Sequence, residues 1–150
     1  MKTPGDDLNI SEGLSIDSPA VSIPWSIYGT ELKTLMGKNL RKVNAGYFTA
    51  SVKIFGDLQC ELGFHFSALG KLERFEFFRN NYDDQVMSYA KFQEVFEREF
   101  GKPNVSRKGD EGFNDCYWDI ENIQIAHYVR NRFVLEEHME IRWIGSKKGE

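Results

Sequence analysis

The sequence predicts an α+β fold in which a helix followed by three strands occurs twice, with both helices on one face of an antiparallel sheet. Apolar residues alternate with polar residues along several runs, which is the pattern of half-buried strands. Two helical segments end at Gly37 and Gly101, 64 positions apart (101 − 37 = 64), and glycine can close a helix in a left-handed conformation. Three strand-like segments follow each glycine, so we interpret the chain as a tandem repeat.

The predicted organisation is one domain between two polar ends. Residues 1–24 are rich in Ser, Asp, Gly and Pro and are expected to form an irregular N-terminal arm. Residues 25–144 are expected to form a single α+β domain built from two half-repeats, 25–80 and 81–144. Residues 145–150 are expected to be a flexible tail.

The first half-repeat shows its strands most clearly. A run beginning at Tyr47 and a run beginning at Leu58 both alternate with period two, and a loop over residues 55–57 would set Ile54 opposite Leu58. A third strand is expected at about 71–79. Its apolar phase slips, which predicts a bulge near Glu73 and Arg74.

The second half-repeat begins with a helix at about 83–100, whose apolar face is predicted from helical spacing. A polar loop is expected over 105–112, and a strand through Cys116 then turns at Glu121–Asn122. A further loop is expected over 130–132, before a last strand that starts at Phe133. The predicted apolar face of the helix consists of Val86, Tyr89, Phe92, Val95, Phe96 and Phe100.

Composition excludes several classes of function. The formal net charge of −4 argues against a general nucleic-acid or membrane-surface binder, because both need an excess of basic residues. No apolar leader or membrane span is visible, and two cysteines do not make a disulfide framework, so we expect a cytoplasmic protein. His and Cys residues show no short ligand spacing, so we expect neither a metal nor a cofactor.

Two stretches resemble a known architecture. Residues 27–37, IYGTELKTLMG, resemble the glycine–Thr/Ser–helix–glycine entry of the β-lactamase inhibitory protein-like repeats. Residues 100–103, FGKP, with Trp118 in a later strand, resemble the matching stretch of that repeat. Small outer-membrane assembly lipoproteins share a related unit, but no lipid-attachment cysteine stands near the N-terminus here. The resemblance covers most of 26–144 and implies protein binding through a sheet face, and many small cytoplasmic bacterial proteins of this general kind are toxin-immunity proteins.

The polar side of the predicted strands is the main candidate site. With the helices on the apolar side, this side would be left open, and its Tyr, His and Arg residues among charges suit a protein interface. Tyrosines would anchor a partner, and the acids of the second half could attract a basic protein such as a toxin. An ordinary solvated sheet face is the competing interpretation. The candidate partner-binding residues are Tyr47, Lys53, Glu61, His65, Asp115, Tyr117, Asp119, Tyr128, Glu136, His138, Glu140 and Arg142.

The most concrete functional hypothesis is a non-enzymatic immunity or inhibitor protein that covers the active site of a toxin or enzyme. Two alternatives remain. Cys116 and His127 are expected opposite each other on adjacent strands, as in a small cysteine-dependent hydrolase, although a buried thiol beside a core histidine is the simpler interpretation. The second alternative is a carrier that holds a small apolar ligand between helix and sheet.

Overall fold

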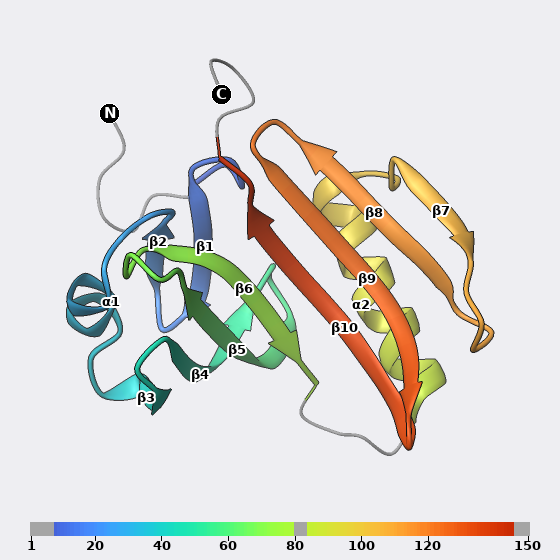
Figure 1. Ribbon diagram of the computed structural model, residues 1–150, viewed down its shortest axis with the longest axis horizontal. Coiled ribbons are helices and arrows are strands. Elements are labelled where there is room, and N and C mark those ends of the chain that lie inside the picture. Colours follow the sequence, from blue (N-terminus) through green and yellow to red (C-terminus); the bar gives the residue numbers. More distant parts are fainter. Residues whose placement is uncertain (1–7, 80–83, 146–150) are drawn as a thin grey trace.

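A computed structural model describes residues 8–79 and 84–145 of the 150-residue chain, and it shows an α+β fold: one ten-stranded antiparallel sheet with two α-helices (Figure 1). The strand order is β2-β1-β4-β5-β6-β10-β9-β8-β7, and β3 pairs with β4 off this path. The elements in chain order are β1 (Gly13–Ser18), β2 (Val21–Pro24), α1 (Gly29–Met36), a 3-10 turn (Gly37–Asn39), β3 (Arg41–Asn44), β4 (Tyr47–Ile54), β5 (Leu58–Phe66), β6 (Leu72–Phe78), α2 (Gln85–Phe100), β7 (Val105–Lys108), β8 (Asn114–Ile120), β9 (Ile123–Arg132) and β10 (Val134–Trp143).

The central strands pair in the register that the apolar alternation predicts. Ile54 lies opposite Leu58, and the β5–β6 register shifts at Glu73, where the bulge was expected. The predicted turn after β8 is also confirmed, because Ile120 pairs with Ile123. Both helices end at the expected glycines, Gly37 and Gly101, which have φ of 56° and 82°.

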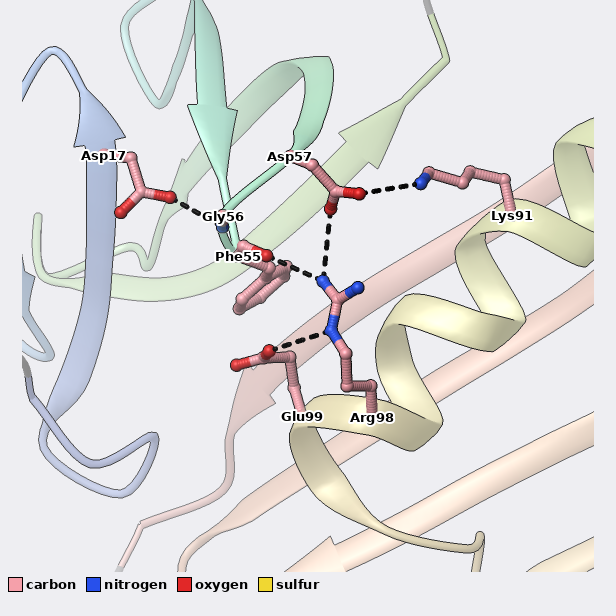
Figure 2. Close-up of polar contacts among 7 residues, drawn as sticks. All are labelled: Asp17, Phe55, Gly56, Asp57, Lys91, Arg98 and Glu99. Atoms are coloured by element: carbon pink, nitrogen blue, oxygen red, sulfur yellow. Dashed lines mark hydrogen bonds and ion pairs between the residues drawn. The ribbon is translucent and has the colours of Figure 1, made fainter.

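The prediction of an irregular arm over residues 1–24 is wrong for its described part. Residues 13–24 form the β1–β2 hairpin, which joins the sheet beside β4 and buries Leu14, Ile16 and Ile23. The side chain of Asp17 accepts a hydrogen bond from the Gly56 N–H at 2.8 Å, which ties this hairpin to the β4–β5 turn (Figure 2). Residues 1–7 and 146–150, which the arm and tail predictions also cover, lie outside the described residues.

Two loops predicted in the second half are strands. Residues 105–108 form the edge strand β7 instead of part of a polar loop, and its side chains are all exposed, so no alternation revealed it. Residues 130–132 continue β9, and the chain turns at Phe133, which has a φ of 74°. Phe133 was expected to begin a strand with its side chain in the core phase, whereas it is fully exposed at the tip of the β9–β10 hairpin.

The core lies between α2 and one face of the sheet. Figure 1 shows α2 crossing behind β8, β9 and β10. The Phe96 ring packs against Phe77 of β6 and Trp118 of β8, with ring centroids 5.5 and 5.9 Å away. Gly29 of α1 approaches the ring of Phe48, which lies on this same face. Val86, expected on the apolar side of α2, is instead exposed.

A polar clamp joins α2 to the β4–β5 turn (Figure 2). The carboxylate of Asp57 accepts hydrogen bonds from Lys91 Nζ at 3.1 Å and from Arg98 Nη2 at 3.2 Å. Arg98 Nη2 also donates to the carbonyl oxygen of Phe55 at 2.7 Å. The hydrogen bonds from Lys91 and then Arg98 hold the pKa of Asp57 below its ordinary value of 3.8.

The clamp predicts a pH-dependent loss of stability in Asp57→Asn. Because the pKa of Asp57 is lower in the folded chain, its contribution is present above about pH 5 and disappears as the pH falls through 3.8 and below. We expect the variant to unfold at lower urea concentration than wild type at pH 7, with the difference shrinking at pH 3. Asp110→Asn, at an exposed carboxylate in the β7–β8 turn, is the control. An equal difference at both pH values would contradict the clamp.

Candidate functional site

The twelve predicted partner-binding residues lie on the face of the sheet that α2 does not cover, which we call the open face. Alternation along the paired strands sets this face opposite the core. Lys53, Asp119 and Arg142 are exposed, and Asp115 is the most buried of the twelve. The register brings most of them together into cross-strand rows, such as the row that joins Asp119 to Arg142 through Gln124, while Lys53 lies farther away on β4.

Aromatic and imidazole rings form pre-ordered stacks on the open face. His138 stacks on Tyr128 with ring centroids 4.8 Å apart, and Tyr128 lies 6.3 Å from Tyr117 on the next strand. The guanidinium of Arg130 sits 4.7 Å from the Tyr128 ring centroid. Beyond the centre of the sheet, Tyr47 stacks on His65 at 4.3 Å in a separate pair. Rings held in this way lose little conformational entropy when a partner covers them.

The acids of the open face are paired within the chain, which changes the expected electrostatics. Arg130 holds Asp115 with two hydrogen bonds, of 2.9 and 3.1 Å. Arg41 lies 2.7 Å from Glu61. Glu136 has His138 at 3.7 Å, and Glu140 lies near Arg74 and Arg142. Because arginines hold Asp115, Glu61 and Glu140, these acids do not form the unopposed negative surface that would attract a basic partner. Asp119 is the exception, since it is exposed and has no ion pair among the described residues.

Two glutamates face each other where the halves of the sheet meet. Glu76 of β6 pairs directly with Glu140 of β10, and both side chains are largely buried, at 20% and 14% exposure. His65 contacts Glu76 at 2.8 Å, while Arg74 approaches Glu140 at 3.5 Å. Burial acts to raise the pKa of Glu76, but the hydrogen bond and charge of His65, with Arg74 and His138, lower it below the usual value. Glu76 is therefore held by an imidazole of β5, and Glu140 by a guanidinium that reaches across the seam from β6.

A depression of about 470 Å³ opens on this face beside the seam. Its lining includes Ala126, which stands opposite Tyr117 on one side and Glu140 on the other. Because alanine has no side chain beyond Cβ, the surface dips between these two larger neighbours. The remaining lining residues are Gln124, Tyr128, Arg130, Asn131, Arg132, His138 and Arg142.

Sequence reasoning missed the apolar tip beside the open face. Phe133, Val134 and Leu135 are all exposed at the end of the β9–β10 hairpin. A non-glycine residue with positive φ is uncommon, and a large exposed ring at such a position is a recognisable surface feature. The alternation of the last strand concealed it, because Phe133 continues the phase of the buried residues that follow. The tip extends the possible contact surface beyond the predicted twelve residues.

On the core face, Cys116 and His127 lie opposite each other as predicted, but they are not arranged for catalysis. His127 Nε2 donates to Glu137 Oε2 at 2.6 Å, and its Nδ1 lies 2.7 Å from Gln93 Oε1. Both ring nitrogens are thus engaged, and no hydrogen bond joins this ring to Cys116, although both residues lie in the described part of the chain. The thiol instead has the Tyr89 hydroxyl 3.7 Å away. The hydrolase alternative therefore lacks the contact that it requires.

Glu137 is the orienting residue that the sequence did not reveal. Its side chain is 2% exposed, and that of His127 is 0% exposed. The carboxylate also accepts hydrogen bonds from Gln85 and Ser88 of α2, so one buried acid connects β10, β9 and the helix. Burial lowers the pKa of His127, although the hydrogen bond and charge of Glu137 oppose this shift. The sequence signal for Glu137 was its position among the core-facing residues in the alternation of β10.

Other kinds of site have little support in the described residues. No group of three or more His, Cys, Asp or Glu side chains in ranges 8–79 and 84–145 is placed to hold a metal ion. Within the same ranges, neither helix is long and apolar enough to cross a membrane. A cleft of about 820 Å³ lies between β1, the β4–β5 turn and the end of α2, with Phe55, Phe100 and the carboxylate of Glu99 in its lining. The apolar-carrier alternative stays a prediction.

Comparison of the chain with protein-family models, with curated proteins and with solved structures gives no match. The resemblance to the β-lactamase inhibitory protein-like repeats therefore stays a prediction. The functional assignment therefore depends on the geometry of the open face.

The buried cluster predicts a large stability loss in Glu137→Ala. The substitution leaves His127, Gln85 and Ser88 without their shared acceptor, and removing one partner of a buried pair costs about 3–5 kcal/mol in free energy of unfolding. Urea unfolding at pH 7 measures this loss. Glu136→Ala, at the neighbouring position on the open face, should change the free energy by less than about 1 kcal/mol. Similar losses in both variants would contradict the assigned role.

Proposed function

We propose that this protein is a non-enzymatic binding module, and most concretely an immunity or inhibitor protein that covers the active site of another protein with its open face. The observation that carries the proposal is the row of rings Tyr117, Tyr128 and His138, which is partly exposed beside a depression and in which His138 stacks on Tyr128. Aromatic residues with arginine are the side chains most often responsible for binding energy at protein interfaces. A sheet face that contacts only solvent does not require aromatic rings to be grouped in this way.

The shape of the surface supports occlusion rather than catalysis. The apolar tip at Phe133 and Val134 stands next to a polar face most of whose carboxylates are already paired. Exposed apolar side chains next to satisfied polar groups are a combination found at protein interfaces. The partner that we propose is another protein, and neither a nucleic acid nor a membrane. We place the protein in the cytoplasm, because Cys60 and Cys116 are both free thiols.

We further propose that the two halves are a tandem repeat. Helix α1 precedes β3–β6 and helix α2 precedes β7–β10, so four strands follow each helix instead of the three that the sequence predicted. The strand order within the sheet runs in opposite directions from the β6–β10 seam. The short strands β3 and β7 occupy corresponding places after each helix. In this interpretation the open face is formed by both repeats, and its centre is the seam between them.

Site-specific photocrosslinking tests the proposed interface. The photoreactive residue p-benzoylphenylalanine replaces Tyr117 or Glu136 on the open face, and Glu94 on the exposed side of α2 as the control. In the native host we expect both open-face positions to crosslink to the same protein, and the α2 position not to do so. The crosslinked protein is identified by mass spectrometry and purified.

Inhibition is then measured with the purified partner. A stoichiometric amount of the wild-type chain should abolish the partner's activity, and Tyr128→Ala should raise the half-inhibitory concentration about 30-fold, since an interface anchor contributes about 2 kcal/mol. Glu94→Gln should leave it unchanged. No crosslink at either open-face position, equal crosslinking at all three, or a partner whose activity is unaffected would overturn the proposal.

A further inference from the structure

We propose that the depression over Ala126 receives an acidic side chain, Asp or Glu, from the partner protein. This inference rests on the proposed function and deepens it, because it gives the chemistry of the group that enters the open face. It reverses the expectation of a basic partner drawn from the acids of the second half.

The charges around the depression favour a carboxylate. Three arginines line it, Arg130, Arg132 and Arg142, against the single carboxylate of Glu140. Glu140 is itself engaged, with Arg142 at 3.6 Å and Arg74 at 3.5 Å. The lining therefore carries an excess of positive charge, which a carboxylate from a partner would reduce.

The pairing within the region identifies the arginine that is left over. Arg130 is committed to Asp115 through two hydrogen bonds, and Arg74 and Arg142 share Glu140. Arg132 has no acidic partner among the residues that the structure describes, and it is exposed. A planar guanidinium binds a carboxylate through two parallel hydrogen bonds, so Arg132 offers a ready donor pair.

The aromatic lining of the depression favours an acidic side chain of a protein over a free anion. Tyr117 stands above Ala126 on one strand, and the Tyr128–His138 stack borders the other side. These rings provide apolar contact for the stem of an acidic side chain and for the residues beside it, while the arginines reach its head. A free inorganic anion would use only the arginines.

An NMR titration of the full chain tests the inference without the partner. The probe is N-acetylglutamate methylamide, and N-acetylglutamine methylamide is the neutral analogue of the same shape. We expect the glutamate probe to shift the amide signals of Gln124, Ala126 and Tyr128 saturably, with a dissociation constant of about 1–10 mM, on the order expected of one small group. The glutamine probe should shift them at least fivefold less at equal concentration.

Variants locate the binding. Arg132→Gln should weaken binding of the glutamate probe at least fivefold, whereas Lys42→Gln, which removes an exposed cation from the distant strand β3, should leave it unchanged. Ala126→Leu fills the depression and should abolish the saturable shifts. Its amide spectrum away from β8–β10 shows whether the fold is retained, and Arg132→Gln serves as the test if it is not.

Several outcomes would overturn the inference. Equal response to the two probes, or equal weakening by Arg132→Gln and Lys42→Gln, would show that no specific carboxylate site exists, while the crosslinking result would still stand by itself. Inorganic phosphate binding as tightly as the glutamate probe would overturn the choice of a carboxylate. Saturable glutamate binding with no protein crosslinked at Tyr117 would overturn both the assignment to a partner's side chain and the proposed function.

Discussion

The pairing of β6 with β10 is the constraint on which the rest of the structure depends. On the core side, Phe75 and Phe77 lie opposite Ile141 and Met139, and these buried rungs fix the register. A shift of one residue would turn every apolar side chain of β10 to the open face. The same register forces Glu76 against Glu140, which is unfavourable for two like charges. The imidazole and guanidinium groups that gather there follow from this requirement.

The open face is consequently not an acidic surface, because most of its charged groups have partners close by. Most of its carboxylates are held by cations of the same chain, so long-range attraction contributes little and recognition depends on short-range shape and hydrogen bonding. The groups of the open face that have no partner among the described residues are unevenly distributed, so its two ends differ. One end carries the unmatched guanidinium of Arg132 with the exposed ring of Phe133, whereas Asp119 lies near the opposite end of the same strands. A partner placed on this surface would meet two different ends.

Period-two alternation allowed the sequence to predict β4, β5, β8 and much of β9 and β10, because each of these strands has one buried and one solvated side. It failed for β7, whose four side chains are all exposed, and for β1 and β2, where Gly13 and Pro24 suggest irregular chain. The open-face residues were placed correctly, since alternation determines the side of a strand. The ion pairs of these residues were not predictable, because they depend on which strands become neighbours. The buried contact between Glu137 and His127 was missed for the same reason.

The two outer strands of the sheet bear on how the molecule can assemble. β2 ends at Pro24, which has no amide hydrogen to offer, and β7 carries Arg107 and Lys108 in its four residues. Short, charged or proline-bearing borders discourage another chain from adding itself by main-chain hydrogen bonding. The backbone ladder thus terminates at each side, and lateral fusion of copies into a continuous ribbon is disfavoured. Contact with other macromolecules is directed to side-chain surfaces, where specificity can be encoded residue by residue.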